Sequence, residues 1–469
     1  MNELTIELSE HSDKHLYEQI YDYIKREIVE GRFHKGDKLP STRALSLFLQ
    51  ISRSTVSLAY DQLLAEGYLE SRQGSGFYVS RIEDLYQITR REISEDVEDT
   101  HPGEKLRYVF SPTDVDMTEF PFQVWKRITR DILVDANTEL FSLGDPQGDL
   151  ILRESIREYL HAARGVNCEA GQIVIGAGND CLLMILQYLL SRETVFAFED
   201  PTYVKAYRTF ADTGYDVRLV SMDESGIRVQ ELEASGADVA YVMPSHQYPT
   251  GVIMPIGRRS ELLKWAQGKH NRYIIEDDYD SEFRYRGKPI PSLQSIDTLG
   301  KVIYMGTFSK SVAPAIRVGY MVLPKELMKR YKKESRFFSS TVSRIDQRIL
   351  NEFMKSGAFE RYLNRMRKVY HTKHDNLLSL LKPFEKHFTI TGENAGLHIL
   401  LTPKEDISEE ELVKSAAKKD VRVFGMSDYH IGMHDREIEK RATILLGYAG
   451  MSSVEMRRGV EALKDAWLT

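Results

Sequence analysis

The stretch IYMGTFSKSVAPAIRVGY, residues 303–320, decides the fold of this chain. It opens as a short apolar run, passes through the hydroxyl residues Thr307 and Ser309, and then presents Lys310. Pro314 prevents a regular helix from following. The apolar flanks indicate that the lysine lies near a core, where desolvation lowers the pKa of an ammonium group and makes the amine a usable nucleophile.

The same stretch supplies donors for a phosphate group. Thr307, Ser309 and Arg317, which follows the lysine by seven residues, are side chains that hold phosphates. A lysine that forms a Schiff base beside a phosphate site indicates pyridoxal 5'-phosphate (PLP). Because a lone lysine is more often a solvated surface charge, this interpretation requires the other parts of a PLP site elsewhere in the chain.

The composition is typical of a globular protein of two or three domains. The 469 residues are 42% hydrophobic and 28% charged, and the net charge of −7 gives no overall signal for nucleic acid. Cys168 and Cys181 form neither a disulfide framework nor a metal-binding spacing, which favours a reducing cytoplasm. The N-terminus lacks the features of a secretory signal, and the most apolar segment, 181–190, is too short to span a bilayer.

Residues 14–80 have the pattern of a compact helical module that ends in a β-hairpin. Ser41 and Ser52 are suitable N-caps for two short helices joined by a tight turn, which is typical of a helix-turn-helix. We expect Phe48 on the buried side of the first of these two helices. YLESRQGSGFYVS, residues 68–80, predicts a hairpin wing. An ordinary three-helix bundle with a hairpin is the alternative.

Charge supports DNA binding by this module only locally. Residues 1–80 hold nine Lys/Arg against twelve Asp/Glu, a net charge of −3, whereas DNA-binding domains are usually basic. The interval 38–60, however, has three cations and no acid. We predict one DNA-facing edge with two kinds of contact. The predicted phosphate contacts are Ser41, Arg43, Thr55 and Arg72, and the predicted base contacts are Arg53, Ser54 and Ser57.

From about residue 106 the pattern changes to strands that alternate with helices. This predicts an α/β fold with a mostly parallel sheet, whose ligands lie at the carboxyl ends of the strands. The β-rich apolar runs are 173–175, 195–198, 239–243, 273–275 and 302–305. Residues 81–105, which are highly charged with weak periodicity, are interpreted as a linker, with a solvated helix as the alternative.

Four predicted strand ends carry residues that suit a PLP site. Gly178 and Asn179 lie in a turn that begins a helix, where backbone N–H groups favour a phosphate. Tyr203 follows the next strand and can stack on a flat ring. Residues 243–251, MPSHQYPTG, form a loop shaped by two prolines and a glycine, although its His246 is more often structural than catalytic.

The fourth strand end is YIIEDDYDSEF, residues 273–283. Alternation along a strand places Asp277 and Tyr279 on one face, and Glu276 and Asp278 on the other. A carboxylate at a pyridinium nitrogen and a phenol at a ring hydroxyl are what a PLP site needs. The alternative is a divalent-metal site, which the lack of a nearby histidine and the lysine 33 residues after Asp277 disfavour.

These motifs resemble two known families. GDKLPSTRAL, SRSTVSLAYDQLLAEGYL and QGSGFYV are similar to the winged helix of GntR-type bacterial regulators. SLGDPQGDLILRESIREYL, IVIGAGNDCLL, PSHQYPTG, IIEDDYDSEF and GTFSKSVAPAIRVGY are similar to motifs of fold-type I aminotransferases. Together they resemble the MocR-type regulators of the GntR superfamily, such as GabR.

The resemblance implies a winged helix-turn-helix (α+β) over 1–80, the linker over 81–105, and an α/β fold-type I PLP-dependent aminotransferase-like domain over 106–469. The large domain of this last part is expected at about 145–325, and a small domain in the remainder.

The resemblance implies roles for the residues of the PLP site. Lys310 forms the Schiff base, Asp277 contacts the pyridinium nitrogen, Tyr279 contacts the ring hydroxyl, and Tyr203 stacks on the ring. The implied phosphate contacts are Gly178, Asn179, Thr307, Ser309 and Arg317.

Effector and DNA contacts follow from the same resemblance. Arg441 matches the arginine that takes the substrate carboxylate in aminotransferases and the effector carboxylate in GabR. Lys205 stands where GabR has a second carboxylate-binding arginine. Tyr248 replaces the asparagine that aminotransferases place against the ring hydroxyl, which argues against efficient turnover. The implied DNA contacts are Arg43, the recognition-helix start Ser52, Arg53, Ser54 and Thr55, and the wing at Gly74.

The implied function is that of a PLP-dependent transcriptional regulator. It would bind a double-stranded DNA operator as a cytoplasmic head-to-tail homodimer and sense a small amino compound through external aldimine formation at Lys310-bound PLP. Any transaminase activity would be weak. One alternative is a catalytically active aminotransferase with a fused DNA-binding domain, and another is a regulator that senses PLP itself.

Overall fold

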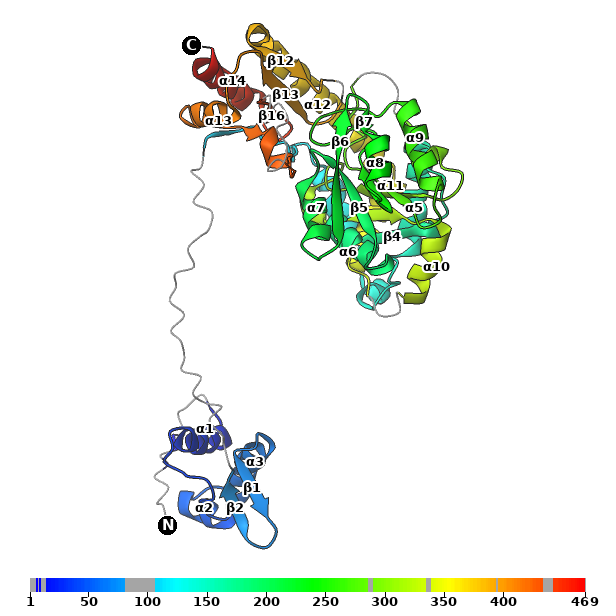
Figure 1. Ribbon diagram of the computed structural model, residues 1–469. Coiled ribbons are helices and arrows are strands. Elements are labelled where there is room, and N and C mark those ends of the chain that lie inside the picture. The colour runs from blue at the N-terminus through cyan, green and yellow to red at the C-terminus, as the bar shows by residue number, and fades with distance from the viewer. Residues whose placement is uncertain are drawn as a thin grey trace. The chain divides into compact units, whose positions relative to one another are not determined.

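The residues described by the computed structural model are 6, 8, 9, 14–80, 106–285, 290–334, 339–393, 395–432 and 442–468. The chain divides into two compact units, residues 1–102 and 103–469 (Figure 1). The predicted linker and Arg441 lie outside the described residues. Within the described ranges, no helix is long and apolar enough to cross a membrane.

The first unit packs three helices against a two-stranded hairpin. Its elements are α1 (Leu16–Val29), α2 (Thr42–Leu49), α3 (Arg53–Ala65), β1 (Leu69–Arg72) and β2 (Gly76–Val79). The Ser41 hydroxyl accepts a hydrogen bond from the backbone N–H of Ala44 at 3.1 Å, and the Ser52 hydroxyl accepts one from Thr55 at 3.2 Å. Both predicted N-caps are therefore confirmed, as are the helix-turn-helix and the antiparallel wing.

The core of the first unit differs from the sequence prediction at one residue. The buried stripe of α2 runs through Thr42, Leu45 and Ser46, whereas Phe48 is 65% exposed. At 3.6 residues per turn, Phe48 lies roughly 110° around the helix from the centre of that stripe. Leu45 of α2 packs in the apolar interior with residues of α1 and α3, where Tyr60 is fully buried and meets the ring of Phe77 edge-on at 4.9 Å.

The second unit contains an eight-stranded sheet in the order β4-β11-β10-β9-β8-β5-β6-β7. Its strands are β4 (Ile173–Gly176), β5 (Val195–Asp200), β6 (Asp216–Asp223), β7 (Gly226–Ile227), β8 (Val239–Val242), β9 (Tyr273–Asp278), β10 (Val302–Thr307) and β11 (Gly319–Val322). The pairs from β10 through β6 are parallel, while β11 and β7 run antiparallel to their neighbours. All five predicted strands are present and begin at the predicted residues.

Helices cover both faces of this sheet (Figure 1). They are α4 (Phe122–Ile132), α5 (Leu150–Arg164), α6 (Asn179–Leu189), α7 (Val204–Ala211), α8 (Val229–Ala234), α9 (Ile256–Gln267), α10 (Lys325–Glu334), α11 (Arg344–Lys355) and α12 (Ala358–Leu381). Phe196 and Tyr241 pack under α6, α7 and α10, whereas their neighbours Ala197 and Ala240 pack under α8 and α9. At the β4 edge, α4, α5, α11 and α12 close the core. This layered arrangement is the predicted α/β fold.

A smaller lobe follows α12. Its elements are β12 (Phe388–Thr391), β13 (His398–Pro403), α13 (Glu409–Ala417), β14 (Val421–Arg422), β15 (Phe424–Gly425), β16 (Ile444–Gly447) and α14 (Ser453–Trp467). Strand β3 (Tyr108–Val109), at the start of the unit, pairs in parallel with β14. Because β3 is held by this lobe, the residues that follow it, Pro112 and Thr113, are carried to the side chain of Lys310.

Candidate cofactor and DNA sites

A cavity of about 560 Å³ contains most of the residues predicted to bind the cofactor. Those that line it are Asn179, Tyr203, Asp277, Tyr279, Thr307, Ser309, Lys310 and Arg317. Lys205, predicted to contact the effector, lines the same cavity, and Gly178 lies under the guanidinium of Arg317. The ends of β9 and β10 adjoin because the two strands are parallel neighbours, which is why residues so distant in sequence meet here.

Lys310 lies in the turn that follows β10. Its Nζ donates to the backbone carbonyl of Thr113 at 2.7 Å and to that of Pro112 at 3.3 Å. Burial lowers the pKa of Lys310 to about 8, although the charges of Asp280 and Asp114 oppose the shift. Burial thus acts on this amine in the direction that the sequence predicted.

The carboxylate of Asp277 lies at the end of β9 and is 3% exposed. The Asn179 amide donates to one of its oxygens at 3.1 Å, and the Tyr241 hydroxyl donates to the other. Burial raises the pKa of Asp277 to about 7, and the nearby Asp278 adds to the shift. The sequence did not indicate the role of Tyr241, because nothing in its strand distinguishes this tyrosine from a core residue.

The other acids of β9 face away from Asp277, which confirms the predicted alternation. Glu276 accepts from the backbone N–H groups of Leu293 and Gln294 at 2.7 and 2.8 Å. Asp278 forms an ion pair with the Arg164 guanidinium at 2.7 Å, and both side chains are almost fully buried. Each acid has its own partners, and the part of the chain that the structure describes holds no group of three His, Cys, Asp or Glu side chains able to bind a metal.

The end of the cavity that is predicted to bind the phosphate is built from two chain turns. The Thr307 hydroxyl donates to Ser309 Oγ at 3.0 Å and accepts from the Ser309 backbone N–H at 3.1 Å. Arg317 reaches Asp180 in the first turn of α6 at 2.9 Å, and this pair is about half exposed. Gly178 has φ of +83°, and a Cβ there would lie 2.7 Å from the Arg317 guanidinium. Glycine thus keeps open a cradle between the helix N-terminus and an arginine.

Aromatic side chains join this cavity to the smaller lobe. The ring of Tyr203 meets that of Tyr248 edge-on at 6.1 Å. The Tyr248 hydroxyl donates to the hydroxyl of Tyr429 at 2.9 Å, so the residue that replaces the usual asparagine is engaged with the smaller lobe. Asp200, near Tyr203, accepts from the backbone N–H groups of Ile431 and Gly432 at 3.2 and 3.3 Å.

The residues present fit PLP. A buried carboxyl with a raised pKa gains from a pyridinium partner, because a cation favours its charged form. The Asn179 Oδ1 atom is buried and has no hydrogen-bond partner among the described residues. The cradle at Gly178 has the shape and charge for a phosphate, and Lys310 supplies the amine.

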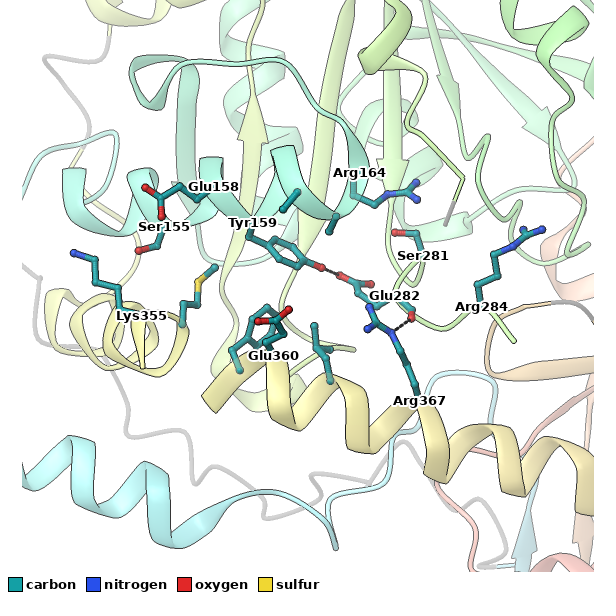
Figure 2. A pocket seen from close by; sticks show the side chains of 15 residues that line it. Ser155, Glu158, Tyr159, Arg164, Ser281, Glu282, Arg284, Lys355, Glu360 and Arg367 are labelled. Carbon is teal, nitrogen blue, oxygen red and sulfur yellow. Dashed lines mark hydrogen bonds between the residues drawn. The ribbon is translucent and has the colours of Figure 1, made fainter. Parts of the chain in front are cut away.

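A second cavity, of about 680 Å³, lies among α5, α11, α12 and the segment after β9 (Figure 2). The Tyr159 hydroxyl donates to Glu282 at 2.7 Å, and the Arg367 guanidinium donates to the Glu282 backbone carbonyl at 2.8 Å. Burial raises the pKa of Glu282 to about 7, and the nearby Asp278 adds to the shift. No residue predicted to bind the cofactor is among the described residues that line this second cavity.

The predicted DNA-contacting residues of the helix-turn-helix lie at the starts of two helices. Ser41 and Arg43 begin α2, and the stretch from Ser52 to Ser57 begins α3. Arg53 Nε donates to the Thr42 hydroxyl at 3.3 Å, which brings the two helix starts together. Arg43 and Ser54 are exposed, whereas Ser57 is half-buried.

The wing carries the remaining predicted DNA contacts. Gly74, with φ of +75°, lies in the turn between β1 and β2. The Arg72 guanidinium lies over the ring of Tyr78 at 4.3 Å and is also paired with Glu70 at 2.6 Å. Lys38 lies 5.7 Å from the same ring, so two cations flank one wing tyrosine.

Comparison with known proteins identifies both units. Residues 113–463 match the family of aminotransferases class I and II, and residues 16–79 match the bacterial regulatory proteins of the gntR family. The uncharacterized HTH-type transcriptional regulator YhdI of Bacillus subtilis is 39% identical over 99% of this chain and 98% of its own. The probable rhizopine catabolism regulatory protein MocR of Rhizobium meliloti is 29% identical over 98% of this chain and 95% of its own. An archaeal alanine:glyoxylate aminotransferase structure has a TM-score of 0.69 and 25% identity, covering 78% of this chain and 91% of its own.

The fold and the cavity define a protein that joins a GntR-type helix-turn-helix to an aminotransferase-like unit. The chain belongs to the MocR-type HTH transcriptional regulators.

Proposed function

We propose that this regulator binds PLP at Lys310 and binds operator DNA through its winged helix, and that a small amino compound at the cofactor changes its affinity for DNA. One observation carries the proposal. A half-buried lysine, a buried carboxylate and a phenol meet in one cavity, in a chain whose first unit is a GntR-type helix-turn-helix. When bound, PLP supplies an electrophilic carbon that captures primary amines.

Each residue predicted to bind the cofactor has a role in this proposal. The lowered pKa of Lys310 leaves a fraction of its amine neutral near pH 7, so the amine can act as a nucleophile. Asp277 holds a proton on the pyridine nitrogen, and Tyr279 contacts the ring hydroxyl. Tyr203 stacks on the ring. The phosphate is bound by Thr307, Ser309, Arg317 and the backbone at Gly178 and Asn179.

The effector binds at the edge of the same cavity. Lys205 lines the cavity, and its ammonium group can attract a carboxylate as a point charge. An arginine at this position would instead bind the carboxylate through two parallel hydrogen bonds. Arg441 contributes a second cation in this proposal. Because the Tyr248 hydroxyl is engaged with Tyr429, the cavity is better suited to reporting a captured amine to the smaller lobe than to repeated turnover.

The protein acts in this proposal as a cytoplasmic head-to-tail homodimer. The winged helix binds DNA through Arg43, Arg53 and the start of α3, with the wing at Arg72 and Gly74 on the phosphate backbone. A symmetric pair of winged helices would match two half-sites of one operator.

The experiment that tests this function combines DNA binding with product stoichiometry. DNA from upstream of the protein's own gene is bound in a gel shift with no ligand, with PLP, and with PLP plus a panel of amino acids, dipeptides and amines. We expect at least one amine to change the shift, and at most one equivalent of keto product per protein in the presence of 2-oxoglutarate. Identical shifts in every lane would refute sensing, and steady turnover would identify an aminotransferase instead.

A further inference from the structure

Tyr279 is in contact with a buried pair of side chains that do not reach the cofactor cavity. His246 and Asp280 are each 3% exposed at the side chain. His246 Nδ1 lies 3.0 and 3.1 Å from the two Asp280 oxygens and 2.9 Å from the Tyr279 hydroxyl. Neither His246 nor Asp280 is among the described residues that line the cavity, whereas Tyr279 does line it. The pair would therefore contact a bound cofactor through Tyr279, although the charge of Asp280 also acts on Lys310.

The carboxylate of Asp280 assigns a hydrogen atom to His246 Nδ1. A carboxylate only accepts hydrogen bonds, so an Nδ1 atom 3.0 Å from Asp280 must carry the hydrogen. An Nδ1 atom that carries a hydrogen cannot accept a second one from Tyr279. The Tyr279 oxygen is then an acceptor from His246, and the hydrogen of the Tyr279 hydroxyl can be donated either into the cavity or to Asp280, whose hydrogen bond contributes to the raised pKa of Tyr279.

The surrounding chain is shaped to hold this histidine ring. Gly396 has φ of +82°, and a Cβ at that position would lie 2.0 Å from the His246 ring. His398 lies beside it, with ring centroids 5.8 Å apart, and its Nε2 donates to the Pro249 carbonyl at 2.8 Å. A side chain is excluded on one side and a second ring packs on another, so His246 has a fixed orientation.

We propose that His246 and Asp280 are positioning residues that turn the Tyr279 hydroxyl toward the ring oxygen of bound PLP. Asp280 keeps a hydrogen on His246 Nδ1, and this hydrogen is shared between Asp280 and the Tyr279 oxygen, so that the phenol donates its own hydrogen into the cavity. This inference rests on the proposed cofactor site. A hydrogen donated to the ring oxygen stabilises negative charge there, and so lowers the pH at which the lysine-bound cofactor loses its proton.

Removal of the histidine would turn the Tyr279 hydroxyl away from the cavity and toward Asp280. Asp280 would become a buried carboxylate without its main donor, and the Tyr279 hydroxyl is the nearest replacement. Tyr279 remains protonated in this setting, because burial raises its pKa well above the usual value and the Asp280 charge adds to the effect. The hydroxyl would then donate to Asp280 and would no longer donate to the ring oxygen of the cofactor.

Other ionisable groups around Tyr279 are common to all variants in the test. They are Asp277, Tyr248, His398 and Lys310. Burial and the neighbouring His246 lower the pKa of His398 to about 4, so it stays neutral through the titration. Burial raises the pKa of Tyr248 beyond the titrated range. Asp280 is also common to all variants but its charge acts on Lys310 directly, so the double variant is needed to separate that effect from the His246–Tyr279 contact.

The test follows the visible absorption of the PLP-loaded full chain from pH 5 to pH 10. His246→Leu should move the midpoint of the colour change upward by about one to two pH units. This shift corresponds to the free energy of one hydrogen bond to a charged group. His246→Asn should stay near the wild type, because its amide N–H replaces the Nδ1 hydrogen. Tyr279→Phe should match His246→Leu, and the double variant should shift no further than Tyr279→Phe alone.

Each outcome decides the proposal. An unchanged midpoint in His246→Leu, an equal shift in His246→Asn, or additive shifts in the double variant would overturn it. If His246→Leu does not retain the cofactor, His246→Gln replaces it, and the same upward shift is expected because that amide lies one bond further out. A wild type that develops no visible absorption with PLP would refute the cofactor site itself, which is a separate result.

Discussion

Lys310 and Asp277 are both shifted toward their neutral forms by burial in the same cavity. The pKa of Lys310 is lowered to about 8 and that of Asp277 is raised to about 7. Each group is therefore close to its titration point near neutral pH. A pyridinium beside Asp277 would restore its charged form, because an opposite charge within a few ångströms offsets the cost of desolvation. Cofactor binding and the ionisation of these two residues are thus coupled.

Lys310→Ala should abolish covalent attachment of PLP, because it removes the amine proposed to capture the cofactor, whereas Lys205, the other lysine lining the cavity, is proposed to contact the effector. The variant should lose the visible absorption of the lysine-bound cofactor and the adduct trapped by borohydride, measured by spectroscopy and intact mass. Lys325→Ala is the matched control, since Lys325 is exposed and pairs with Glu169 at the surface. A borohydride-stable adduct on the Lys310→Ala protein would show that the lysine assignment is wrong.

Arg317→Ala should weaken PLP far more than it weakens pyridoxal, which lacks the phosphate. One charge-assisted hydrogen bond corresponds to roughly 10- to 100-fold in affinity. The measurement is the ratio of the two dissociation constants, determined by absorbance titration of the apo-protein. Arg330→Ala, on the surface of α10, should leave the ratio unchanged. An equal loss for PLP and pyridoxal would indicate that Arg317 acts on the fold and not on the phosphate.

At the scale of elements, the end of β9 and the residues that follow it contribute side chains to both cavities. Asp277 and Tyr279 line the cofactor cavity, while Glu282, a few residues later, faces the second cavity with Tyr159 (Figure 2). Asp278 lies between them and is paired with Arg164 of α5. The rigid, fully buried strand therefore fixes the acid and the phenol of the candidate site, and its continuation connects to α5 and α12.

Glu282→Gln should change how the stability of the chain depends on pH. The pKa of Glu282 is raised to about 7 in the folded protein, so the folded state binds a proton that the unfolded state releases near pH 4.5. Wild-type stability is lowered as pH rises through this window. The glutamine variant, which can still accept from Tyr159, should be about 1–3 kcal/mol more stable than wild type at pH 8 and similar at pH 4.

Thermal unfolding midpoints of the full chain between pH 4 and pH 8 measure this effect. Glu360→Gln is the control, because Glu360 lines the same cavity but is exposed. A Glu282→Gln curve parallel to that of wild type would mean that Glu282 is already charged in the folded protein.

Arg53→Ala, at the start of the recognition helix, should weaken specific DNA binding about 10- to 100-fold and relax the preference for operator sequence. Its guanidinium lies where the starts of α2 and α3 meet. Fluorescence anisotropy with operator and scrambled duplexes at fixed salt measures both effects. Arg32→Ala, in the turn after α1, is the control. An equal loss of affinity for the operator and the scrambled duplex would show that Arg53 contacts phosphates and not bases.

At the scale of the whole molecule, the sequence predicted those features that depend on local pattern. The strand ends at Gly178, Tyr203, Asp277 and Lys310 could be identified, because parallel neighbours share one edge and each turn has its own residues. The hydrogen bond from Lys310 to Thr113 spans 197 residues and depends on how β3 pairs with the smaller lobe. No periodicity encodes such a contact.

Two further features were beyond the reach of sequence pattern. Tyr241 lies in an apolar strand and is recognisable as a partner of Asp277 only once β8 and β9 are paired. Phe48 was expected inside and is exposed, because the buried stripe of a two-turn helix can be drawn in more than one way from its residues. In both cases tertiary packing determined the outcome, whereas the local pattern allowed several.

The central claim is that a small amine captured at the PLP on Lys310 changes the affinity of the protein for DNA. It is tested most directly by the dissociation constant of PLP-loaded full-length protein for DNA from upstream of its gene, with and without each amine of the panel. For at least one amine we predict a change of about fivefold or more in the wild type and none in Lys310→Ala, because coupling between two sites is commonly 5- to 150-fold. Equal dissociation constants with and without every amine, or the same change in Lys310→Ala, would contradict the account.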